Sequence, residues 1–320
     1  MPAAGRIDLE IEPESCARAE EMRKAESGIA AASSVPECIN WLNQREVEKC
    51  CMRKLDAGTD YVRYAIGEVT VIALQDGYVD MPPSRLRQSG NRPFGSDLPT
   101  KVELIEGKLR LSVNAFLVID GGQHILIDTG AADSWLPTMG SLLGALEEAG
   151  VARDSIGTAA LTHTHEDHVN GLVAADGSDA FPNLDRLFVP QEEIQLFDSI
   201  DRVARFRQRR LPFGEGFSLS ASVTAVQAHG HEVGHTAFEV SSAGETLLIW
   251  GDTVHVPSIQ FVRPELTWEF DANQNQARSS RQSLLRRAVQ PNFFVAGAHL
   301  NFPGVGTVSE CDDAFCFTPL

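Results

Sequence analysis

The sequence contains no apolar run approaching the roughly 20 residues that a membrane-spanning helix needs. Its beginning, from Met1 to Glu14, alternates small, acidic and apolar side chains. It therefore lacks the basic and apolar regions of a secretory signal. We expect a cytoplasmic protein with no membrane-spanning segment.

Basic residues are scarce. Lys and Arg number 27 against 44 Asp and Glu, which gives a formal net charge of -17 over 320 residues. A surface this acidic repels phosphate backbones and anionic headgroups. We therefore expect neither a nucleic-acid partner nor binding to anionic membranes.

Cysteine is also infrequent, and none of the cysteines lies near the histidine-rich segment described below. The six are Cys16, Cys38, Cys50, Cys51, Cys311 and Cys316. Without a secretory signal, we expect them to be reduced thiols. The adjacent pair at 50 and 51 lacks the spacing of a zinc knuckle.

The composition is otherwise that of a soluble globular protein, with 43% hydrophobic and 22% charged residues. Residues 1–58 have a helical character, with one helix expected over Glu14–Ala32 and a second after Pro36. We expect this helical extension to pack on the main body or to mediate a homodimer. The main body is then residues 59–320.

In the main body, short apolar strands alternate with helices, and no internal repeat is visible. The expected strands cover residues 68–74, 109–119, 123–127, 157–162, 186–189, 223–226, 237–240, 247–250 and 293–296. The expected helices cover residues 135–149, 191–210 and 274–288. This mixture predicts an α+β fold in which two mixed sheets, with helices outside, share one core.

The densest cluster of chemically active residues follows the expected strand 157–162. His163, His165, Asp167 and His168 place four coordinating groups within six residues. A single histidine is usually structural, but imidazole and carboxylate groups at this density are typical ligands of Zn²⁺ and related ions. The segment therefore predicts a metal site.

Three later strands also end in a candidate ligand. His231 follows the strand that ends near Gln227, Asp252 follows Leu247–Trp250, and His299 follows Phe293–Ala296. Because one loop supplies too few ligands for a complete site, we expect these residues to complete it.

Taken together, these motifs resemble the metallo-β-lactamase superfamily. The matching segments are His163-x-His165-x-Asp167-His168, Gly230-His231, Gly251-Asp252, His299 and the upstream Leu126–Gly130. Within the superfamily, the sequence is most similar to the methyl parathion hydrolase and lactonase group. That likeness rests on residues 69–77, 250–255, 259–261, 269–271 and 298–304.

The resemblance implies an αβ/βα sandwich with two divalent ions at its mouth, Zn²⁺ first, with Mn²⁺, Fe²⁺ or Co²⁺ as alternatives. One ion would be held by His163, His165 and His231, and the second by Asp167, His168 and His299. Asp252 would bridge them. Asp128 would orient a ligand histidine, His255 would line the pocket, and His235 would be structural.

The sequence departs from the pattern of several relatives. The family's Pro-Gly-His-Thr-Pro-Gly-His stretch is replaced here by residues 229–235, which lack proline and add His229. The tyrosine that acyl homoserine lactonases use beside the metals is not found, since all three tyrosines precede His163. The chain ends 21 residues after His299, so we expect no C-terminal substrate domain of the glyoxalase II type.

The expected activity is hydrolysis of an ester, a lactone or a phosphotriester in a small, rather apolar substrate. Asp252 and Asp167 are the expected catalytic residues, and the water activated by two metals would be the nucleophile. We expect pocket walls from residues 82–99 and 191–217. The alternatives are a thioester hydrolase, a mononuclear iron dioxygenase and a non-catalytic binding protein.

Overall fold

The computed structural model of the chain describes residues 52–312 and 314–320. The two helices expected within residues 1–51 lie outside the described part, as do four of the six cysteines. Residues Arg53–Ala57 form strand β1 rather than the end of a helical extension. This strand pairs antiparallel with β2 (Tyr61–Ile66), so its backbone groups are satisfied at the edge of a sheet.

The first sheet has eight strands in the order β1-β2-β3-β6-β7-β8-β9-β10. The other members are β3 (Val69–Met81), β6 (Leu109–Asp120), β7 (Gln123–Ile127), β8 (Thr158–Ala160), β9 (Arg186–Pro190) and β10 (Arg210–Phe213). Strands β7 to β10 are mutually parallel, whereas the pairs from β1 to β7 are antiparallel. The sheet is therefore mixed.

The second sheet has six strands in the order β11-β12-β13-β15-β16-β17. They are β11 (Val223–Gln227), β12 (Thr236–Ser242), β13 (Glu245–Ile249), β15 (Phe293–Ala296), β16 (Val305–Cys311) and β17 (Ala314–Pro319). Only β13 and β15 pair in parallel. A small third sheet joins β14 (Thr267–Trp268), β4 (Leu86–Gln88) and β5 (Arg92–Pro93).

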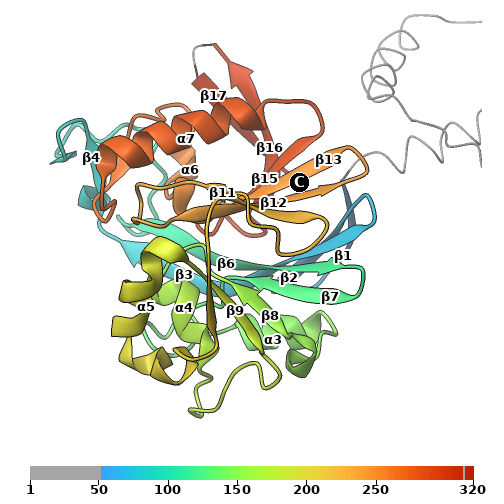
Figure 1. Ribbon diagram of the computed structural model, residues 1–320. Helices are drawn as coiled ribbons and strands as arrows, with labels where there is room; N and C mark the ends of the chain where they lie inside the picture. The colour runs from blue at the N-terminus through green and yellow to red at the C-terminus, as the bar shows by residue number, and fades with distance from the viewer. Residues whose placement is uncertain (1–51, 313) are drawn as a thin grey trace, which may run out of the picture. The chain divides into compact units, whose positions relative to one another are not determined.

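One hydrophobic core lies between the two large sheets. Val71 and Phe116 from the first sheet and Phe238 and Ile249 from the second belong to the same buried cluster. Figure 1 shows α3 (Leu142–Glu148), α4 (Glu166–Val169) and α5 (Ile194–Ser199) beside the first sheet, and α6 (Pro257–Gln260) and α7 (Gln274–Ala288) beside the second. The predicted α+β sandwich of two mixed sheets is confirmed. No helix of the described residues combines the length and apolar character that crossing a bilayer requires.

Two of the three expected helices differ from the observed ones. The helix expected over 135–149 begins only at Leu142, because Pro137 and Gly140 (φ +94°) interrupt the preceding residues. The helix expected over 191–210 is divided into two 3-10 turns and α5. The helix expected over 274–288 is α7, with the same bounds.

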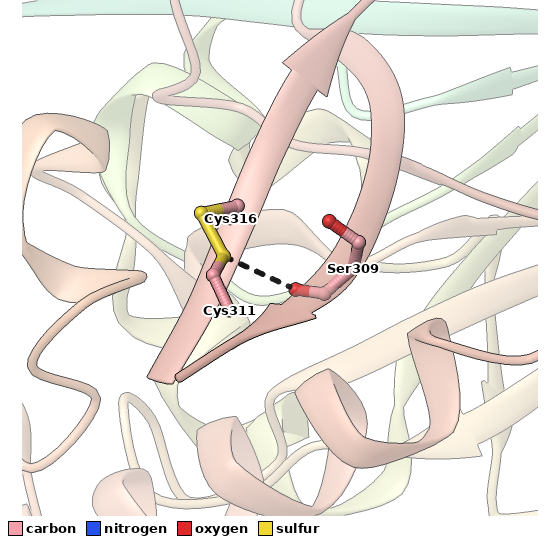
Figure 2. Close-up of a disulfide and its surroundings, with 3 residues drawn as sticks. All are labelled: Ser309, Cys311 and Cys316. Atoms are coloured by element: carbon pink, nitrogen blue, oxygen red, sulfur yellow. Dashed lines mark hydrogen bonds between the residues drawn. A yellow bond between two sulfur atoms is a disulfide. The ribbon is translucent and has the colours of Figure 1, made fainter. Parts of the chain in front are cut away.

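The expectation of reduced thiols is wrong for one pair of cysteines. Cys311 at the end of β16 and Cys316 in β17 form a disulfide (Figure 2). The register of this hairpin pairs Cys311 with Ala314 and Ser309 with Cys316. It brings the two cysteine Cα atoms to 5.9 Å, within the usual range for a disulfide.

A buried carboxylate fixes the loop between β7 and α3. Asp76, in the middle of β3, accepts hydrogen bonds from the backbone N–H groups of Ala131 (2.9 Å) and Leu142 (3.1 Å). Burial raises the pKa of Asp76 to about 6, although these N–H groups partly offset the effect. The folded protein therefore holds the proton of this group more tightly than the unfolded chain does.

This difference predicts that ionisation of Asp76 lowers the free energy of unfolding as the pH rises from about 4 to about 6, by up to ~3 kcal/mol. The measurement is urea unfolding of the metal-free wild type and the Asp76→Asn variant across this range. The stability of the wild type relative to the variant should fall with rising pH.

Asp80 on the same strand is the matched control. Its hydrogen bonds to Arg110 lower the pKa of the Asp80 carboxyl, so its contribution should be lost as the pH falls. Equal pH dependence of the Asp76→Asn and Asp80→Asn variants would contradict this account.

Candidate metal centre

All seven predicted ligands converge at one edge of the sandwich. The loop after β8 and the short helix α4 carry the four residues from His163 to His168. From the second sheet, His231 follows β11, Asp252 follows β13 and His299 follows β15. These three strands run in the same direction, so their carboxyl ends meet at the same edge.

The converging side chains form four overlapping groups that could each hold a metal ion. Two of them contain all seven predicted ligands, whereas the other two include His255. The first of the two ligand groups consists of His163, His165, His231 and Asp252, and the second of Asp167, His168 and His299. Within each group, the ligand atoms lie within 4.8 Å of one another. Asp252 also lies close to the second group, since its carboxylate oxygens are 3.2 Å from His168 Nε2 and 3.0 Å from His299 Nε2.

The donor atoms at the centre fit metal ions better than they fit one another. His163 Nε2, His168 Nε2 and Asp252 Oδ1 are buried and have no hydrogen-bond partner among the described residues. Unpaired buried polar atoms are costly, and here they point into one cluster of imidazole and carboxylate groups. Divalent cations such as Zn²⁺ would satisfy this donor set.

Several of these histidines are held through the ring nitrogen that faces away from the centre. His168 Nδ1 donates to Asp128 Oδ2 (2.8 Å), His231 Nδ1 to Asp271 Oδ1 (2.9 Å) and His299 Nδ1 to the Ser112 carbonyl (2.7 Å). A proton held on Nδ1 leaves Nε2 free to coordinate a metal.

Asp128 occupies the position that the sequence predicted for an orienting carboxylate. It follows β7 with a positive φ of +61°. In addition to binding His168, its carboxylate accepts hydrogen bonds from the Thr162 backbone N–H (2.8 Å) and hydroxyl (2.9 Å). Asp128 thus connects the end of β7 to the start of the histidine loop.

The ring of His165 is turned the other way, so that Nδ1 rather than Nε2 faces the centre. Its Nε2 donates to Glu232 Oε1 (2.9 Å), and its Nδ1 lies 3.1 Å from His231 Nε2 inside the centre. Two nitrogens that face each other at this distance without a shared proton would repel, whereas a cation between them would bind both. Glu232 replaces the threonine of the family's stretch, and its effect on His165 is a property of this chain.

The electrostatics of the centre keep His163 neutral and Asp252 ionised. Burial, together with His168 and His165, lowers the pKa of His163 well below its usual value. Burial would raise the pKa of Asp252, but His299, His168 and His163 hold it well below its usual range. Both groups are therefore in the protonation state that coordination requires.

Three other histidines of the centre are shifted in the opposite direction. Against the effect of burial, Asp252 raises the pKa of His168, His231 and His299 above the usual histidine value. A cation bound among these groups would replace those protons.

The other two histidines of the cluster have different environments. His235 Nδ1 donates to the Ala228 carbonyl (2.8 Å) and its Nε2 accepts from the Asp252 backbone N–H (3.0 Å), so neither nitrogen is free for a metal. His255 has no hydrogen-bond partner on either nitrogen, although its Nε2 is 3.3 Å from Asp252 Oδ2. Burial lowers the pKa of both histidines to about 3. His229 belongs to neither ligand group.

Three buried or half-buried acids near the ligands were not among the predicted site residues. Besides Asp271 and Glu232, Glu193 accepts from the Thr164 hydroxyl (2.6 Å) and the Gly234 backbone N–H (2.7 Å). It thereby ties the loop of His163 to the loop of His231. Glu193 lies in the charged helix expected over 191–210, so nothing in the local sequence distinguishes it from the other acids there.

A pocket with a cavity volume of about 40 Å³ opens at the ligands. Its apolar walls come from the last residues of β3, from the start of β6, from Trp135, from β14 and from Phe270 just after β14. These wall residues are Val79, Met81, Leu111, Trp135, Trp268 and Phe270. The expected walls, residues 82–99 and 191–217, do not line it. In the second of these segments, Phe197, Phe206 and Phe213 are buried in the hydrophobic core.

Comparison with known proteins identifies the class that this fold and site define. The family model described as the metallo-beta-lactamase superfamily matches residues 109–299. The chain belongs to this superfamily. The prediction of an enzyme of the metal-dependent hydrolase class is confirmed at the level of the superfamily. A search of curated proteins finds no match.

Solved structures of the superfamily match nearly the whole described chain. Hydrolase AbOPH is 27% identical, with a TM-score of 0.72 over 83% of this chain and 99% of that one. The dizinc quorum-quenching lactonase AidC, solved with a homoserine product, is 22% identical, with a TM-score of 0.72 over 84% and 97%. A probable metal-dependent hydrolase from Staphylococcus aureus is 18% identical, with a TM-score of 0.65 over 79% and 98%. The last two show the shared fold.

The contact between Glu232 and His165 predicts that Glu232→Gln weakens zinc binding at one of two sites by about 10- to 100-fold, because the carboxylate makes the ligand imidazole more basic. The measurement is titration of metal-free protein with zinc against a competing chelator. Glu166→Gln is the control, since Glu166 lies between ligands but is exposed. Equal effects of the two substitutions would refute the assigned role.

Proposed function

We propose that this protein is a dinuclear metal hydrolase that cleaves an ester or lactone bond in a small, uncharged and largely apolar substrate. The observation that carries the proposal is the pair of ligand groups sharing Asp252 at the floor of an apolar pocket. Zn²⁺ is the first choice for both ions, with Mn²⁺, Fe²⁺ or Co²⁺ as alternatives.

In this proposal, His163, His165 and His231 would hold one ion and Asp167, His168 and His299 the other, and both groups would share Asp252. Two ions bound here would supply a water activated for attack and would polarise the substrate carbonyl. The carboxylate of Asp252 is surrounded by histidine nitrogens at 3.0 to 3.8 Å. Asp252 receives the proton of the attacking water and returns it to the leaving oxygen. Asp128, Asp271 and Glu232 keep the ligand rings in place.

The pocket restricts the charge of the substrate. No Lys or Arg is among the residues that line it, and its walls include two tryptophans and a phenylalanine. The carboxylate of a β-lactam would meet no Lys or Arg along these walls, whereas an uncharged ester loses little hydration there. None of the three tyrosines, all of which are described, lines the pocket. This supports a lactonase or esterase that does not use tyrosine.

The arrangement of ligands also bears on the alternative activities. A mononuclear iron dioxygenase needs only one group of ligands. Here a second group, Asp167, His168 and His299, lies beside the group that contains Asp252. A thioester hydrolase would use the same centre and remains the second candidate. A hydrolysable phosphotriester is also uncharged and suits the same apolar walls.

A hydrolysis panel tests the proposal. Zinc-loaded protein should hydrolyse aryl esters or γ- and δ-lactones at least tenfold faster than β-lactams, and chelation should abolish the activity. The panel should also contain acyl homoserine lactones, an aryl thioester and a nitrophenyl phosphotriester. Turnover of the β-lactam alone would refute the proposed substrate class.

Substitution of a ligand tests the metal assignment. His163→Ala should remove one zinc per chain and reduce kcat by at least 100-fold, because the first group loses a buried donor. His229→Ala is the matched control, because His229 lies in the same region but outside both groups. The measurements are metal content and steady-state kinetics. Unchanged metal content in His163→Ala, or a single iron per wild-type chain, would contradict the dinuclear centre.

A further inference from the structure

A second, small cavity of about 30 Å³, here called the side cavity, borders the metal pocket. The two cavities share Leu111 and His255 as wall residues. Their other walls differ in character. The metal pocket is apolar away from the ligands, whereas the side cavity combines the apolar residues Leu109, Val256 and Pro257 with four polar ones, Glu103, Arg110, Ser258 and Asn301.

His255 stands between the two cavities with unused hydrogen-bonding capacity. It is only 1% exposed, and neither ring nitrogen has a hydrogen-bond partner among the described residues. Its ring is fixed by stacking on Trp268, with centroids 5.0 Å apart and planes at 11°. A buried polar group without a partner is destabilising unless a ligand or water satisfies it.

The polar groups of the side cavity are suited to an uncharged ligand. Arg110 is neutralised by two hydrogen bonds to Asp80, both 2.8 Å. Glu103 adds a negative charge, so the cavity offers no free cation to a carboxylate. Ser258 Oγ accepts from the Glu103 backbone N–H (3.2 Å), which leaves its hydroxyl hydrogen free to donate.

Asn301 completes this set of groups. Its side-chain amide is exposed and makes no hydrogen bond to the described residues, so it can both donate and accept. A serine hydroxyl and a carboxamide together match a ligand group that itself donates and accepts.

We propose that the side cavity binds a neutral hydrogen-bonding group, a hydroxyl or a carboxamide, on a substrate whose ester or lactone carbonyl lies at the metal centre. This inference rests on the proposed hydrolase function and narrows its substrate class. The substrate is apolar around the scissile bond, and its polar end extends past Leu111 and His255.

Matched pairs of aryl esters test the proposal. In each pair, the acyl chain ends either in a carboxamide or in an isopropyl group of similar shape, and the chain length is varied between pairs. For zinc-loaded wild type, kcat/KM should be about tenfold higher for the carboxamide member at the length that reaches the cavity. A carboxylate end should give no such gain.

Substitutions in the side cavity then test whether its residues cause the preference for the carboxamide ester. Asn301→Ala and Ser258→Ala should bring the carboxamide-to-isopropyl ratio close to one, while Asn275→Ala, an exposed residue of α7, should keep the wild-type ratio. A wild type without preference at any length, or a preference that survives in the Asn301→Ala, Ser258→Ala double variant, would overturn the proposal.

A binding measurement separates this proposal from the proposed function. Non-hydrolysable ketone analogues of the same pairs are titrated into zinc-loaded protein by calorimetry. If the carboxamide analogue binds about tenfold more tightly than the isopropyl analogue, and Asn301→Ala removes this difference, the side cavity is supported. If no ester is hydrolysed in that case, only the hydrolase proposal fails. Equal binding of both analogues refutes the side cavity even when ordinary esters are hydrolysed.

Discussion

The structure depends on one buried carboxylate surrounded by histidines. Asp252 lies within 4 Å of the rings of five of them, namely His163, His168, His231, His255 and His299. Removing this carboxylate from water is costly unless opposite charge or donors surround it. The backbone N–H of Asp252 is fixed as well, because it donates to His235. The candidate ligands of both sheets thus converge on the side chain that β13 delivers.

Around this carboxylate, the ligand rings are positioned by partners on the opposite side. Asp128, Asp271 and Glu232 each bind one histidine, and Glu193 links the two histidine loops. Such partners fix which nitrogen faces the centre before any ion arrives. They also explain why several donor atoms in the centre lack protein partners.

The convergence of the candidate ligands could be predicted from the sequence because each follows a strand with a clear apolar pattern. His231, Asp252 and His299 could be placed at one edge once their strands were identified, and Asp128 followed from its place after β7. Glu193 and Asp271 could not be placed, because their roles arise from contacts with residues about 30 to 40 positions away. Trp268 and Phe270 were missed as pocket walls for the same reason, since a short strand pair with β4 positions them. The late start of α3 at Leu142 depends on Pro137 and Gly140, whose effect the apolar spacing obscured.

The account is tested most directly by anomalous diffraction from crystals of zinc-loaded protein, collected on both sides of the zinc absorption edge. It predicts two zinc peaks per chain, one on each side of the Asp252 carboxylate. One peak should be bounded by His163, His165 and His231, and the other by Asp167, His168 and His299. A single peak, or peaks that do not involve Asp252, would contradict the dinuclear centre.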